Sequence, residues 1–124
     1  MNVLEVNSLV LAYLGDSVYE NYVRDYLIKS GINHVKELQE ESLNFVSAKS
    51  QARILKELIN KQVFTEEELV IIKRARNAKT NSHPKNTDII TYKEATSLEA
   101  IIGYLKLKNN IERIEELMDI IFQN

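Results

Sequence analysis

A glycine and an aspartate stand next to each other in an otherwise apolar helical stretch, residues 11–20, with the sequence LAYLGDSVYE. Glycine in a helix interior is destabilising by about 1 kcal/mol relative to alanine, so Gly15 predicts a place where another backbone comes close. Asp16 lies where the helix is expected to bury its apolar face, and a buried ionised carboxylate is costly unless it is paired or bound to a metal. We therefore expect Asp16 either to pair with a neighbour such as Arg24 or to serve a function.

One long helix is predicted to carry both residues. Ser8 is suited to the N-cap and Gly31 to the position just after the C-terminus, and no proline lies between them. The apolar residues at helical spacing are Leu11, Leu14, Val18 and Tyr22.

A second unusual carboxylate, Glu99, lies in a helix predicted to begin at residues 91–94, TYKE, a capping box whose threonine takes the N-cap. Its inward side chains are predicted to be Ala95, Leu98, Ile102 and Leu105. Gly103 lies one turn beyond Glu99 on the same face, as Gly15 lies beside Asp16. Two helices that each carry a glycine at a crossing approach closely, which would bring the two acids within reach of one cation.

The rest of the chain alternates helical patterns with turns. The further helical segments are residues 35–46, a continuation over 47–59 with Ser47 as its N-cap, residues 65–77 behind a TEEE capping box, and residues 111–122. Residues 77–90 form one long loop, and a loop of that length in a compact domain tends to be functional. Six or seven helices and no strand predict an all-α fold, with residues 1–124 as a single domain.

Composition predicts an ordinary soluble protein, and we expect it to be cytoplasmic. The chain is 44% hydrophobic and 27% charged, and no apolar run approaches the roughly 20 residues that a membrane span needs. Its N-terminus lacks the basic and apolar regions of a secretory signal, and the absence of cysteine excludes disulfides and thiolate metal sites. We expect no association with a membrane.

Basic residues concentrate between Leu69 and Thr87, where the chain has no acidic residue although its net charge is −2. The residues predicted to contact nucleic-acid phosphates are Arg74, Arg76, Lys79 and Lys85. The alternative is a solvated helix end, where a cation contributes only about 0.3–1 kcal/mol.

Two motifs resemble those of the ribonuclease III superfamily. LAYLGDSVYE resembles the signature helix of its catalytic domain, and residues 95–104, ATSLEAIIGY, resemble its second catalytic helix. Residues 74–79 and 84–88, together with Tyr92, extend the likeness to Mini-III, the short bacterial branch that has no double-stranded-RNA-binding domain.

This resemblance implies a single ribonuclease III-like endonuclease domain that forms a homodimer. It also implies a magnesium-dependent endoribonuclease that cuts double-stranded RNA and matures large-subunit (23S) ribosomal RNA precursors. One active site cuts one strand, so a two-fold dimer supplies the two sites that a duplex requires. A water on magnesium would attack the phosphodiester and leave 5′-phosphate and 3′-hydroxyl ends.

The sequence departs from the family pattern at three acidic positions, which are occupied here by Leu9, Ala12 and Thr96. Asp16 and Glu99 remain as the predicted catalytic and metal-binding residues. Magnesium is usually held by one or two carboxylates plus waters and substrate phosphate, so two acids suffice, but the number of ions stays open.

Two other functions are compatible with parts of the sequence. The acids at residues 37–41 and 116–119 are similar to those of all-α nucleoside triphosphate pyrophosphohydrolases, although more than seventy residues separate the two groups. The missing family acids would also suit a catalytically inactive RNA-binding module.

Overall fold

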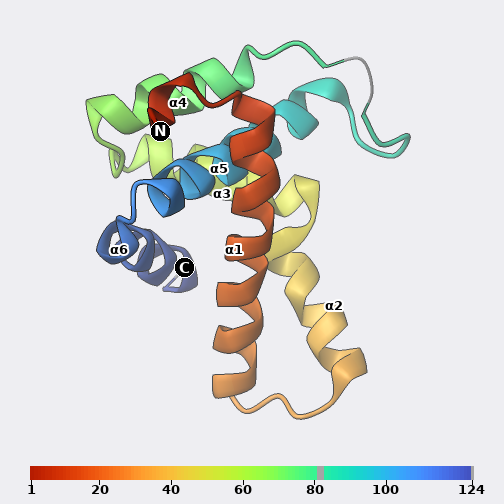
Figure 1. Ribbon diagram of the computed structural model, residues 1–124. Helices are drawn as coiled ribbons and strands as arrows, with labels where there is room; N and C mark the ends of the chain where they lie inside the picture. Colours follow the sequence, from red (N-terminus) through yellow and green to blue (C-terminus); the bar gives the residue numbers. More distant parts are fainter. Residues whose placement is uncertain (81–82, 124) are drawn as a thin grey trace.

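The computed structural model describes residues 1–80 and 83–123, and every regular element in these ranges is helical. A one-turn 3-10 helix, Val3–Glu5, precedes six α-helices: α1 (Ser8–Lys29), α2 (Val35–Val46), α3 (Ala48–Asn60), α4 (Glu66–Arg76), α5 (Ile89–Leu107) and α6 (Ile111–Phe122) (Figure 1). The predicted all-α fold of six or seven helices is confirmed. No helix in the described part of the chain combines the length and apolarity needed to cross a bilayer.

Helix α5 lies at the centre of the molecule, because its side chains are buried on almost every face. Its buried apolar residues are Ala95, Leu98, Ala100, Ile101, Ile102, Tyr104 and Leu105. Helices α1, α3 and α4 all pack against it. Figure 1 shows α1 crossing α5, while α2 and the C-terminal half of α1 extend together beyond the other helices. Burying each leucine or isoleucine contributes about 1.5–3 kcal/mol, so α5 organises the core.

Several predicted helix ends are confirmed. Thr65 Oγ1 accepts from the Glu68 backbone N–H at 3.1 Å, and Glu68 Oε1 accepts from the Thr65 backbone N–H at 2.9 Å, which completes the capping box of α4. Ser47 separates α2 from α3 and caps α3 by accepting from the Ser50 backbone N–H at 3.1 Å. Gly31 ends α1 with a φ of +109°, a left-handed conformation that favours glycine.

Two helix starts differ from the prediction. Helix α1 is capped by Asn7 rather than by Ser8, and the Asn7 side chain accepts a backbone hydrogen bond at 2.8 Å. Helix α5 is capped by Asp88 rather than by Thr91, because Asp88 accepts hydrogen bonds from the Thr91 backbone N–H at 2.8 Å and from its hydroxyl at 2.9 Å. Asparagine and aspartate are at least as good at the N-cap as serine and threonine. The loop between α4 and α5 is therefore shorter than predicted.

Candidate functional site

Helices α1 and α5 touch backbone to backbone at two glycines. A Cβ atom placed on Gly15 would lie 1.7 Å from the carbonyl oxygen of Glu99, and one placed on Gly103 would lie 1.9 Å from the carbonyl oxygen of Leu11. Neither position therefore has room for any other residue. The predicted close crossing of two glycine-bearing helices is confirmed.

Asp16 lies beside this crossing, but it is exposed and not part of the buried face. The buried face of α1 runs through Leu11, Gly15, Tyr19, Val23 and Leu27, one residue per turn, which leaves Asp16 at its edge. The expectation of a carboxylate inside an apolar face was wrong, because Gly15 and not Leu14 meets α5. Pairing with Arg24 is not observed either, since Arg24 forms its ion pair with Glu20 at 3.7 Å.

Glu99 lies half-buried across the crossing, with its carboxyl group hydrogen-bonded to that of Asp16. Burial raises the pKa of Glu99 from 4.5 to about 8, and the hydrogen bond and negative charge of Asp16 add to the rise. Without a cation, Glu99 therefore holds a proton at neutral pH. The structure thus brings the two predicted site residues together.

Two further residues of the site were missed in the sequence. Glu20 lies one turn after Asp16 on α1, and its charge also raises the pKa of Glu99. Gln51, on α3, is only 3% exposed, and its amide opposes that rise although its Nε2 completes no hydrogen bond among the described residues. The four-residue spacing of Glu20 from Asp16 was a usable signal. No sequence signal marks Gln51, because its position beside Glu99 depends on how α3 packs against α5.

The donor set fits a magnesium ion. Magnesium is usually held by one or two carboxylates, with water and substrate phosphate completing its octahedron. A cation between the two carboxyl groups would replace the proton on Glu99 and offset the negative charge of its neighbour Asp16. Over residues 1–80 and 83–123, no three histidine, cysteine or acidic side chains form a metal-binding group.

Arg74, one of the four predicted phosphate contacts, binds the N-terminal segment instead of facing solvent. Its guanidinium donates to Ser8 Oγ at 3.2 Å, to the Val6 carbonyl at 3.1 Å and to the Leu4 carbonyl. Hydrogen bonds from a charged group contribute about 1.5–3 kcal/mol, which exceeds the small effect of a cation at a helix end. Arg74 therefore stabilises the fold by holding the N-terminal segment against α4.

The other three predicted phosphate contacts are exposed. Arg76 lines a cleft between α3 and α4, whereas Lys79 and Lys85 lie in the loop that follows α4. Lys79 also lines a hollow of about 570 Å³ beside Leu9 at the start of α1. Leu9 and Asp16 are seven residues apart, so they share one face of α1 about 10 Å apart along its axis. The basic loop therefore begins next to the face that carries Asp16.

Comparison with known proteins shows the family of the chain. Residues 9–110 match the ribonuclease III domain. The chain is 44% identical over 115 residues to a mini-ribonuclease 3 of Enterococcus faecalis, covering 93% of this chain and 87% of that relative. It is 47% identical over 112 residues to a mini-ribonuclease 3 of Brevibacillus brevis, covering 90% and 82%. A crystal structure of a Fusobacterium nucleatum protein is similar with a TM-score of 0.85 and 37% identity, over 97% of this chain and 96% of that one.

Proposed function

This chain belongs to the ribonuclease III family, in its Mini-ribonuclease 3 branch, and is an endoribonuclease; from this premise we propose that it cuts double-stranded RNA with magnesium bound at Asp16 and Glu99. The observation that carries the proposal is the hydrogen-bonded pair of carboxyl groups beside the glycine crossing. Because two backbones in contact fix their separation, the two acids are held ready for one ion.

Each acid has its own part in this reaction. Glu99, half-buried, gives up its proton when the cation binds, and Asp16, exposed, presents its carboxylate towards the RNA backbone. When bound, magnesium supplies a readily deprotonated water and stabilises negative charge on the phosphate. The expected products carry 5′-phosphate and 3′-hydroxyl ends.

Double-stranded RNA would be recognised by its shape and phosphates rather than by its sequence. The face of α1 that carries Asp16 continues to Leu9 and the hollow lined by Lys79, which makes the basic loop the nearest source of phosphate contacts. Lys79 and Lys85 are exposed and suited to this contact, while Arg74 supports it indirectly by holding the N-terminal segment.

A homodimer follows from the need to cut both strands, because a two-fold axis places two sites on one duplex. Beside the face that carries Leu9 and Asp16, α1 exposes two large apolar side chains: Tyr13 is 84% exposed and Val10 is 55% exposed. Large apolar side chains gathered in one exposed patch are typical of an interaction surface. We assign this patch to contact with a second copy of the chain.

The resemblance to Mini-III extends the proposal to a substrate. We infer that the chain trims structured precursors of large-subunit ribosomal RNA in the cytoplasm. This inference rests on the likeness of the two carboxylate-bearing helices, and of residues 74–79 and 84–88, to that family.

Cleavage of a defined duplex tests the proposed function. With magnesium, we expect both strands to be cut, leaving 5′-phosphate and 3′-hydroxyl ends, and we expect a chelator to stop the reaction. Sedimentation of the same preparation should give a mass near twice 14.3 kDa.

Single-stranded RNA of the same sequence is the control and should stay intact. Binding of the duplex without cleavage would instead favour the inactive RNA-binding module. A preparation that sediments only as a monomer while severing both strands would contradict the dimer.

The double variant Lys79→Ala, Lys85→Ala is expected to bind duplex RNA more weakly and to show a flatter salt dependence. Each lost phosphate contact should reduce the slope of log affinity against log salt by about one. Filter binding at several salt concentrations measures this slope.

Two comparisons make this result specific. Replacing the exposed Lys36 and Lys106, on α2 and α5, should leave the slope unchanged. Arg74→Ala should lower the melting temperature instead, because it releases the N-terminal segment. An unchanged slope in the Lys79, Lys85 variant would make the loop a connector only.

A further inference from the structure

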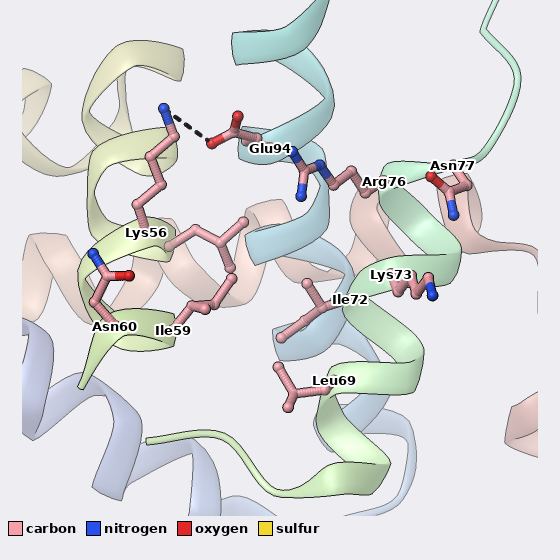
Figure 2. A pocket seen from close by; sticks show the side chains of 10 residues that line it. Lys56, Ile59, Asn60, Leu69, Ile72, Lys73, Arg76, Asn77 and Glu94 are labelled. Atoms are coloured by element: carbon pink, nitrogen blue, oxygen red, sulfur yellow. Dashed lines mark ion pairs between the residues drawn. The ribbon is translucent and has the colours of Figure 1, made fainter. Parts of the chain in front are cut away.

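A cleft of about 540 Å³ opens between α3 and α4, with α5 as its floor (Figure 2). Its two walls are apolar: Figure 2 shows Ile59 of α3 facing Leu69 and Ile72 of α4 across the gap, and Leu55 of α3 also lines the cleft. Ile59 is 38% exposed and Leu69 is 40% exposed, so the walls remain open to solvent. The volume lies within the range of small-molecule sites, and two facing apolar walls suit a flat ring.

One end of the cleft holds a buried carboxyl group that has an ion pair but an incomplete set of hydrogen bonds. Glu94, on α5, is only 4% exposed, and its Oε2 is buried without a hydrogen bond from any of the described residues. Lys56 Nζ lies 3.5 Å from that oxygen, which is an ion pair but not a hydrogen bond. Figure 2 shows Arg76 reaching from α4 into the cleft on the side opposite Lys56. A buried acceptor with spare capacity is unusual in a folded protein and points to a missing donor.

This cleft is separate from the Asp16 and Glu99 pair. Glu94 and Glu99 are five residues apart on α5, which turns their side chains roughly 140° away from each other. No residue of α1 lines the cleft, whereas α1 provides Asp16. A duplex bound over the catalytic acids would therefore leave the cleft free for another ligand.

We propose that the cleft between α3 and α4 binds a guanine nucleoside phosphate, with the base between the apolar walls and its edge against Glu94 and Lys56. Guanine presents two adjacent N–H donors, which a carboxylate accepts, beside the O6 acceptor, to which a lysine donates. Adenine presents a ring acceptor where guanine has a donor, so it would leave Glu94 unsatisfied. The phosphate would bind Arg76 and Lys73, since the cleft carries three cations against one acid.

Titration of the RNA-free protein with GMP and with AMP, followed by calorimetry, tests this proposal. We expect saturable binding of GMP at a single site, at least about tenfold weaker binding of AMP because a buried polar group would go unpaired, and no saturable binding of inorganic phosphate alone. Glu94→Gln should weaken GMP binding by at least about tenfold, since the carboxylate is replaced by an amide with a donor and only one acceptor. Circular dichroism checks that this variant folds.

Arg76→Ala should also weaken GMP binding, because it removes a proposed phosphate contact. Arg76 is exposed, so this variant should fold and tests the proposal even if Glu94→Gln does not fold. Lys106→Ala is the control: Lys106 lies on the central helix α5 but outside the cleft, so this variant should bind GMP as the original protein does. Asp16→Asn should leave GMP binding unchanged, which distinguishes this site from the active site. Equal binding of AMP, unchanged binding in either cleft variant, or loss of binding in Asp16→Asn would overturn the proposal. These results do not depend on whether the protein cuts duplex RNA.

Discussion

Replacing Asp16 by asparagine or Glu99 by glutamine is expected to lower the rate of duplex cleavage at least about a hundredfold, with little change in helical content. Each substitution removes one of the two carboxylates proposed to hold the metal, while it keeps the size of the side chain. Cleavage rates at saturating RNA and circular dichroism measure the two effects. Glu112→Gln, which changes an exposed acid on α6, is the matched control.

Metal binding gives a second readout that does not depend on activity. The pKa of Glu99 is raised from 4.5 to about 8, so the folded, metal-free protein binds this proton more tightly than the unfolded chain does. The stabilisation is therefore complete below about pH 4.5 and is lost as the pH rises through 8. Magnesium should release the proton and offset that loss, so its stabilising effect should grow with pH.

Melting curves at several pH values, with and without magnesium, measure this dependence. Glu99→Gln should remove both the loss of stability at high pH and the effect of magnesium. Full activity in either carboxylate variant would refute the site assignment. A lower melting temperature in Asp16→Asn, with unchanged turnover of the folded protein, would make Asp16 a structural residue.

The features that sequence could predict are those determined by a few neighbouring residues. The capping box at Thr65 depends on two side chains three residues apart, and the break at Ser47 depends on one good N-cap. Gly15 and Gly103 could be assigned to a crossing because a helix tolerates glycine poorly, so each required an explanation. The all-α fold follows from these patterns.

The features that sequence could not predict depend on distant contacts. Leu14 and Val18 flank Asp16 and so predict that it lies on the buried face of α1. The face that contacts α5 instead runs through Gly15, the residue before Asp16. Arg74 was read as a surface cation because nothing local shows its bonds to residues 4–8. Gln51 beside Glu99 likewise follows only from the packing of α3 on α5.

The glycine crossing makes the second large prediction. Gly15→Ala and Gly103→Ala are each expected to destabilise the fold by about 3 kcal/mol, because the added methyl would overlap a backbone carbonyl that cannot turn aside. For a domain of this size that is a fall in melting temperature of roughly 10 °C. The sign of the change in unfolding free energy is diagnostic, since replacing a glycine by alanine in a helix is otherwise stabilising by about 1 kcal/mol. Thermal unfolding measures the change, and Ser17→Thr, which adds one methyl group to the exposed side of α1, is the control.

The same variants test how the fold prepares the site. If α1 must move away from α5 to admit the methyl group, Asp16 separates from Glu99, because Gly15 is next to one acid and contacts the backbone of the other. Cleavage should then fall even at temperatures where the variant remains folded, and the pKa of Glu99 should shift towards 4.5 as Glu99 becomes less buried and Asp16 withdraws. A Gly15→Ala protein that melts and cleaves like the original would show that the crossing is loose. The two acids would then have to be held together by something other than the contact between α1 and α5.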